Sequence, residues 1–129
     1  AAIRNPVCAS PEKKNLLVDC LIQVNASGEE SKQGFEINQV PGFVASFKFK
    51  RIKIRGLMTI GPVTEDPGKI RQSFRSVKNL QQELKKNFPE KDWDILSMGM
   101  SGDYPAAIAE GSTLVRIGTA IFGERRSLK

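Results

Sequence analysis

The sequence has no histidine, two cysteines, and one residue each of tryptophan and tyrosine among its 129 residues. Without histidine it lacks the commonest metal ligand and the usual general base near neutral pH. Cys8 and Cys20 form neither a CxxC pair nor a zinc pattern, so we expect two reduced thiols. No stretch approaches the ~20 apolar residues of a membrane span, and no segment resembles a signal peptide. These absences predict a cytoplasmic protein, or a mitochondrial one in a eukaryote, without a metal centre.

The length and composition are those of one domain. With 40% apolar and 26% charged residues, the chain has enough apolar surface for a core without disulfide or metal crosslinks. It is nevertheless far shorter than the ~250 residues of a closed (β/α)8 barrel. Residues 1–15 are polar and interrupted by Pro6 and Pro11, so we expect a linker or the tail of a missing element there. The folded unit is expected over residues 16–129.

The net charge of +6 is concentrated in the middle of the chain. Residues 48–91 carry 12 basic and 4 acidic side chains, whereas residues 1–47 and 92–129 each carry 4 basic and 5 acidic ones. Such a stretch attracts nucleic acid or another polyanion, or it forms the solvated face of a helix. Few aromatic side chains are present to stack on bases, which makes the nucleic-acid hypothesis the weaker one.

Apolar runs alternate with helical patterns along the chain. We expect strands over 16–24, 48–60, 93–98 and 114–117, and helices over 38–47, 66–88, 105–110 and 120–123. Alternation of this kind is typical of parallel βα units. The nearly continuous apolar run over 16–24 predicts a strand covered on both faces. Four βα units would fill the chain.

The clearest helix follows Asp66 and Pro67, which suit the N-cap and the first helical position. Apolar residues then recur with helical spacing at Ile70, Phe74, Val77, Leu80, Leu84 and Phe88. They predict an amphipathic helix of about five turns whose other face is basic. Pro89 ends it.

Candidate binding residues follow the last two predicted strands, because ligands of parallel α/β folds lie where strands end and helices begin. Gly118 and Thr119 open a helical turn whose free N–H groups suit a phosphate, and Ser97 and Ser101 add hydroxyl groups. The alternative is an ordinary turn without a ligand. Arg116 lies in an otherwise apolar strand, so its guanidinium either reaches a ligand or forms an ion pair outside the sheet.

Other polar and sulfur-containing residues carry weaker predictions. Lys32 lies in a glycine-containing loop and is a weak candidate for an anion contact. Asp103 or Ser101 is expected to cap the helix over 105–110 rather than to act as a base. Met98 and Met100 are expected to pack in the core.

Three segments together resemble a known family. They are LIQVNASGEESKQGF (21–35), RGLMTIGP (55–62) and LSMGMSGDYPAAIAEGSTLVRIGTAIFGER (96–125). They resemble the YggS/PROSC family, the pyridoxal phosphate homeostasis proteins, and the resemblance extends from about residue 16 to residue 125. It implies an alanine racemase-like (β/α) barrel that carries pyridoxal 5′-phosphate (PLP).

The resemblance also implies roles for single residues. The family's phosphate contacts correspond to Ser97, Gly118 and Thr119, and the arginine that faces the pyridine nitrogen corresponds to Arg116. A permanently charged arginine disfavours protonation of that nitrogen, which makes the ring a poorer electron sink. The family resembles a cofactor carrier more than an enzyme, so a PLP-dependent racemase-like enzyme is the less favoured alternative.

The chain departs from the family in one respect. The lysine that anchors the cofactor covalently lies in a Val-Ser-Lys-Thr-like context at the end of the first barrel strand, and no segment here resembles it. We therefore expect about four βα units, equivalent to the last four strands of the barrel. Such a half barrel would have two open parallel edges, which predicts a dimer or pairing with the missing first half.

Overall fold

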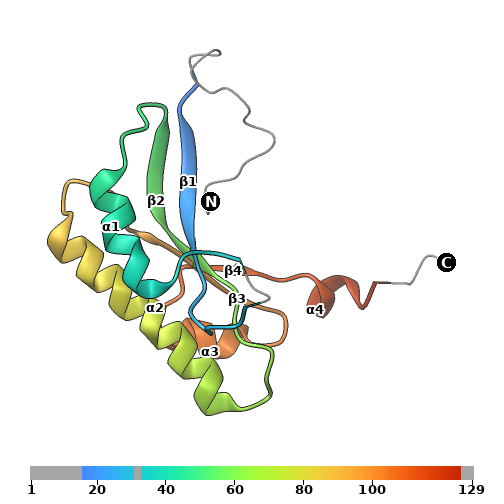
Figure 1. The fold of residues 1–129 in the computed structure, drawn as a ribbon. Helices are drawn as coiled ribbons and strands as arrows, with labels where there is room; N and C mark the ends of the chain where they lie inside the picture. Colours follow the sequence, from blue (N-terminus) through green and yellow to red (C-terminus); the bar gives the residue numbers. More distant parts are fainter. Residues whose placement is uncertain (1–15, 31–32, 126–129) are drawn as a thin grey trace.

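The computed structural model describes residues 16–30 and 33–125, which form one sheet and its covering helices (Figure 1). The strands are β1 (Val18–Val24), β2 (Ile52–Thr59), β3 (Ile95–Met100) and β4 (Leu114–Arg116). The helices are the 3-10 turn η1 (Ile37–Gln39), α1 (Val40–Ser46), α2 (Pro67–Asn87), α3 (Tyr104–Ala109) and α4 (Thr119–Phe122).

The sheet order is β1-β2-β3-β4, and each neighbouring pair is parallel. Parallel neighbours in chain order require a crossover between strands, which η1–α1, α2 and α3 supply. The predicted succession of parallel βα units is therefore confirmed. Four such strands are half the number in a closed eight-stranded barrel.

Helix α2 begins where the sequence predicts. The Asp66 Oδ1 accepts a hydrogen bond from the backbone N–H of Gly68 at 2.9 Å, and Pro67 occupies the first turn, where no N–H is needed. The predicted stripe is buried at Phe74, Val77, Leu80 and Leu84 and half-buried at Ile70 and Phe88. This stripe packs the helix against β2 and β3.

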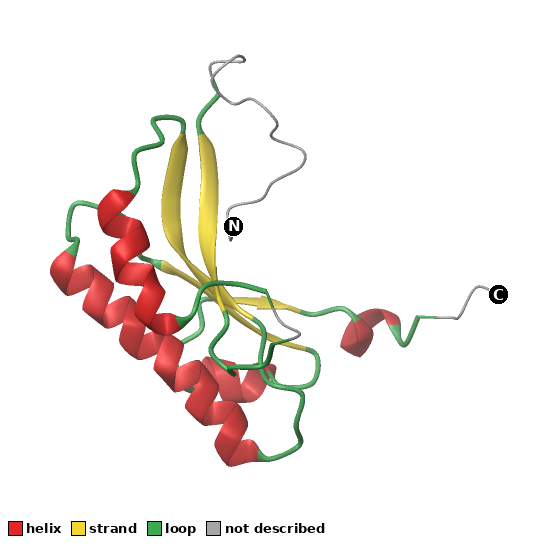
Figure 2. Ribbon diagram, in the orientation of Figure 1, coloured by secondary structure: helices red, strands yellow, loops and turns green. Residues whose placement is uncertain are grey.

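Helices α1, α2 and α3 lie on the same side of the strands, whereas α4 stands apart from the rest of the fold (Figure 2). The core forms between the helices and the sheet. Its largest fully buried side chains are Trp93, Phe74, Ile22, Leu57, Leu80, Leu84, Leu96 and Met98. Burial of each stabilises the fold by about 1.5–3 kcal/mol. None of the described helices is long and apolar enough to cross a membrane.

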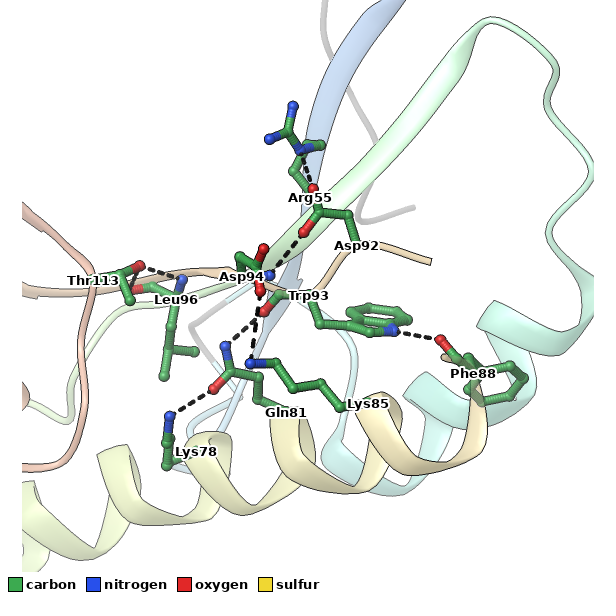
Figure 3. A network of polar contacts seen from close by, with 10 residues as sticks. All are labelled: Arg55, Lys78, Gln81, Lys85, Phe88, Asp92, Trp93, Asp94, Leu96 and Thr113. Atoms are coloured by element: carbon green, nitrogen blue, oxygen red, sulfur yellow. Dashed lines mark hydrogen bonds and ion pairs between the residues drawn. The ribbon is translucent and has the colours of Figure 1, made fainter. Parts of the chain in front are cut away.

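Polar contacts join the amino end of β3 to the second half of α2 (Figure 3). The Trp93 indole N–H donates to the backbone oxygen of Phe88 at 3.0 Å, and the Gln81 amide donates to the backbone oxygen of Trp93 at 2.6 Å. Lys78 in turn donates to the side-chain oxygen of Gln81 at 3.0 Å. Because Gln81 is only 1% exposed, these bonds satisfy polar groups that water does not reach.

Ion pairs occupy several of the basic side chains between residues 48 and 91. Glu110 accepts from Arg71 Nε at 3.0 Å and from Arg75 Nη2 at 2.9 Å, and the Arg55 Nε lies 2.9 Å from Asp92 Oδ2. The hydrogen bonds from Arg75 hold the pKa of the Glu110 carboxyl below its ordinary value. These pairs favour the interpretation of the basic stretch as a solvated helix face over a nucleic-acid surface.

The prediction that the first strand is covered on both faces is wrong. Leu16 and Leu17, expected in that strand, precede β1 and are 50% and 64% exposed, and Asp19 is exposed within it. The reason is that α1, α2 and α3 lie on one side of the strands, and in β1 the core on that side holds Ile22 and Val24. An apolar run shows which residues avoid water but not which layer of the fold covers each face of the strand.

Two local predictions also need correction. Asn38, expected as the N-cap of the helix over 38–47, lies inside η1 instead, and Gln39 is the N-cap of α1. Met98 is buried as expected, but Met100 at the end of β3 is 42% exposed. The predictions for residues 1–15, including the thiol state of Cys8, lie outside the described residues.

Candidate functional site

Arg116 lies at the carboxyl end of β4 and its side chain reaches across the sheet. Its Nη2 donates a hydrogen bond to the backbone oxygen of Thr59, the last residue of β2, at 3.0 Å. The Thr59 hydroxyl donates to the backbone oxygen of Val24, the last residue of β1, at 2.7 Å. These two bonds connect the carboxyl ends of three strands. The guanidinium therefore has a fixed position at the edge where parallel sheets bind ligands.

The Arg116 guanidinium is only partly satisfied by these contacts. Its Nε is buried and has no hydrogen-bond partner among the described residues. Burial lowers the pKa of the guanidinium, and the negative charge of Asp103 partly offsets that effect. An arginine remains charged near neutral pH even so. Among residues 16–30 and 33–125, Arg116 forms no ion pair, and its guanidinium contacts the backbone oxygen of Thr59.

Ser101 joins the turn after β3 to the turn after β4. Its Oγ accepts hydrogen bonds from the backbone N–H groups of Gly118 and Ala120, each at 3.1 Å. Because the oxygen accepts twice, the hydroxyl proton is left to donate to a further acceptor. Both N–H groups are therefore bonded to Ser101, and the hydroxyl proton is the donor of this contact that remains for a ligand.

Asp103 holds the turn that carries Ser101. Its Oδ1 accepts from the backbone N–H of Met100 at 2.8 Å, so the expected side-chain cap of α3 does not form. A Cβ on Gly61 would come within 2.5 Å of the Asp103 Oδ2. Glycine at position 61 therefore lets the turn after β2 approach the turn after β3.

The predicted site residues differ in where the structure places them. Ser101 and Gly118 lie together, and Thr119 is the first residue of α4 and is exposed. Ser97 lies inside β3, 2% exposed and in register with Leu114, at the amino end of β4 rather than at the Gly118 turn. Lys32 lies outside the described residues.

Sequence reasoning missed the parts that Thr59, Ala120 and Asp103 play in this arrangement. Thr59 accepts from Arg116 through its backbone oxygen and donates to Val24 through its hydroxyl, whereas Ala120 contributes only its N–H, so its side chain gives no signal. A threonine at the end of the apolar run of β2 is a weak hint of a polar contact. Asp103 was expected only as a helix cap.

Among the described residues, no lysine forms a hydrogen bond or ion pair with Arg116, Ser101, Gly118 or Thr119. The described lysines lie between residues 48 and 53, on α2, and at Lys91. The searched residues also contain no group of three or more histidine, cysteine, aspartate or glutamate side chains that could hold a metal ion.

The fold defines a parallel βα protein of the half-barrel type, with Arg116 and the Ser101–Gly118 contact at the carboxyl ends of its last strands. The sequence pattern of the family described as alanine racemase, N-terminal domain, matches residues 7–126. The chain belongs to this family.

The relatives are more specific than the family. The chain is 44% identical over 115 residues to a pyridoxal phosphate homeostasis protein of Aquifex aeolicus, covering 88% of this chain and 50% of that protein. It is similar in structure to PipY of Synechococcus elongatus without PLP, with a TM-score of 0.81, 29% identity, and coverage of 88% of this chain and 53% of PipY. PipY with PLP bound gives a TM-score of 0.77 at 28% identity, covering 86% of this chain and 51% of PipY.

These matches confirm the resemblance to the pyridoxal phosphate homeostasis proteins and the alanine racemase-like fold. The chain spans about half the length of the relatives it matches.

Proposed function

We propose that this chain is a PLP-binding part of a pyridoxal phosphate homeostasis protein, one that carries the cofactor rather than turning it over. The observation that carries the proposal is the fixed position of Arg116 on the backbone of Thr59, at the edge where Ser101, Gly118 and Ala120 converge. The names of the relatives and the PLP bound to PipY support it.

The residues present fit the phosphate end of PLP. A Cβ on Gly118 would meet no atom within 4 Å, so the space on the Cβ side of this residue is open among the described residues. A phosphate oxygen there would accept from the Ser101 hydroxyl, whose orientation is fixed by the N–H groups of Gly118 and Ala120 that donate to its oxygen. Thr119 would add its hydroxyl. Ser97 remains a candidate through the resemblance alone, since its place inside β3 separates it from this turn.

Arg116 fits the ring end. Its buried and unpartnered Nε is a donor that an acceptor such as an unprotonated pyridine nitrogen would satisfy. When bound, PLP supplies an electron sink through a protonated ring nitrogen. A guanidinium beside that nitrogen keeps the proton off it, because the two positive charges repel. The pair therefore favours storage and transfer of the cofactor over racemase or decarboxylase chemistry.

Weak and reversible PLP binding is the expected behaviour of this chain alone, because no lysine in the segments described here lies at the candidate site. Titration with PLP, followed by absorbance, should give a saturable but weak complex. Borohydride reduction and intact-mass measurement should then show no stoichiometric label. Stoichiometric labelling of one buried lysine would contradict the proposal.

We also propose that the chain pairs through its open sheet edges, with a first half barrel or with a second copy. Strands β1 and β4 each have a neighbour on one side only among the described strands. Apolar side chains are exposed at both edges, Leu17 at 64% before β1 and Leu114 at 47% in β4. Unpaired parallel edges promote association. A clean monomer in light scattering would contradict this pairing.

The expected compartment is the cytoplasm, or the mitochondrion in a eukaryote.

A further inference from the structure

The loop between α1 and β2 carries aromatic and basic side chains in the order Phe-Lys-Phe-Lys-Arg over residues 47–51. It lies at the amino end of the sheet, where the Val18 N–H donates to the backbone oxygen of Arg51 at 2.8 Å. Figure 1 shows this end of the sheet away from α3 and α4. The loop is therefore on the opposite edge of the sheet from Arg116 and Ser101, and a partner bound there leaves the candidate PLP site open.

Phe49 presents an apolar ring to solvent on this loop. It is 56% exposed, and its ring packs against the ring of Phe47 with the centroids 5.3 Å apart. Phe47 in turn contacts Phe43, with centroids 5.7 Å apart, and both of these rings pack against the core. The row of rings therefore supports the loop from inside and leaves Phe49 as its exposed end. One exposed apolar side chain is ordinary on a protein surface, so the neighbouring charges decide what this loop binds.

Basic side chains flank this ring without acidic partners among the described residues. Lys48 and Lys50 are exposed, and neither they nor Arg51 forms an ion pair or a side-chain hydrogen bond with any residue that the structure describes. A further ammonium group, that of Lys91, lies 5.5 Å from the centroid of the Phe47 ring. The positive charge of the loop is thus not neutralised within this part of the chain, and it attracts an anionic surface.

Two kinds of anionic partner match such a loop, a membrane of anionic lipids and a single-stranded nucleic acid. Beside the loop, Leu16 is 50% exposed two residues before Val18. An aliphatic side chain gains from burial at a lipid interface but offers no ring to stack on a base. Single-stranded nucleic acids stack on successive aromatic rings, whereas this loop exposes one. We propose that residues 47–51 bind the surface of an anionic lipid membrane, with Phe49 inserted among the headgroups and the three basic side chains against the lipid phosphates.

Co-sedimentation of the chain with lipid vesicles, without PLP, tests the proposal. Mixed vesicles of phosphatidylglycerol and phosphatidylcholine should bind the chain, and added salt should weaken that binding. Vesicles of phosphatidylcholine alone should bind it far less. Phe49→Ala and Lys50→Gln should each lower the partition coefficient on the mixed vesicles about fivefold, because each removes one interfacial ring or one basic contact. Circular dichroism of each variant establishes that it is folded.

Two matched control variants carry the same changes outside the loop. Phe122→Ala removes a ring that is 83% exposed in α4, and Lys69→Gln removes an exposed lysine in the first turn of α2. Both should bind to the mixed vesicles like the unchanged chain. Equal losses in the control variants would show general adhesion of exposed apolar and basic groups and would overturn the proposal.

A single-stranded oligonucleotide is the probe for the other anionic partner. No binding to the mixed vesicles would overturn the proposal, and binding of the oligonucleotide instead, weakened by Phe49→Ala, would assign the loop to a nucleic acid. Binding to phosphatidylcholine vesicles as strong as to the mixed ones would also overturn it. Absorbance titration with PLP should give the same affinity for Phe49→Ala as for the unchanged chain, so failure of this proposal is distinguishable from failure of the proposed function.

Discussion

The guanidinium of Arg116 donates to the backbone oxygen of Thr59 at 3.0 Å, across the end of the intervening strand β3. The two residues are 57 positions apart in the sequence. The contact fixes a positive charge at the carboxyl edge of the sheet without neutralising it, because a backbone oxygen carries no formal charge. That combination is what a site for an anionic or acceptor-bearing ligand requires.

Replacing the guanidinium tests its part in PLP binding. Arg116→Gln is expected to raise the dissociation constant for PLP about tenfold, since a charged hydrogen bond contributes about 1.5–3 kcal/mol. Absorbance titration of the folded variant measures it. Arg51 immediately precedes the amino end of β2, at the edge of the sheet opposite to Arg116. Arg51→Gln is therefore the control and should bind PLP like the unchanged chain. Equal affinities of the two variants for PLP would show that Arg116 is not part of the PLP site.

Two serine variants separate the structural assignment from the family correspondence. Ser101→Ala removes the oxygen that accepts from Gly118 and Ala120, and it should weaken PLP binding about tenfold. Ser97→Ala should have a smaller effect on PLP affinity, because Ser97 lies inside β3. Pyridoxal, which lacks the phosphate, should bind to Ser101→Ala and to the unchanged chain equally. A larger loss of PLP affinity in Ser97→Ala would contradict the placement of the phosphate at the Ser101 turn.

The helix pattern and the strand order were predictable because each depends on local information. The stripe that includes Phe74 and Leu84 has helical spacing, and alternating strands and helices leave few topologies besides a parallel sheet. Which of Ser97 and Ser101 lies beside Gly118 was not predictable from the residues. It depends on where β3 ends relative to β4, which is set by inter-strand hydrogen bonds. The contact of Arg116 depends on a backbone atom that any residue supplies.

Gly56 is a position where the sheet leaves no room for a side chain. It has a φ of +152°, and a Cβ there would overlap the backbone oxygen of Ile95 on the neighbouring strand. Gly56→Ala should therefore destabilise the fold by about 3 kcal/mol or more, from strain and displaced backbone. Urea unfolding followed by fluorescence of Trp93, the single tryptophan and 1% exposed, measures the change.

Gly42→Ala is the matched control for this substitution. Gly42 lies within α1, and a Cβ there would meet no atom within 4 Å. Alanine is the better helix former, so this variant should be unchanged or stabilised by up to about 1 kcal/mol. Similar free energies of unfolding for Gly56→Ala and Gly42→Ala would show that the sheet adjusts at Gly56 without cost.

Glu110 should make part of the stability depend on pH. Hydrogen bonds from Arg75 and Arg71 hold its pKa below the ordinary value of 4.5. Because the folded-state pKa lies below the unfolded one, the stabilisation is complete above about pH 4.5 and is lost as the pH falls through the folded-state pKa. Glu110→Gln should therefore unfold at lower urea than the unchanged chain at pH 7, and the gap should narrow in acid. Glu83→Gln, at an exposed position of α2, is the control and should unfold at the same urea concentration as the unchanged chain at pH 7. A gap for Glu110→Gln that stays constant into the acid range would show that the loss is one of packing rather than of the carboxylate's charge.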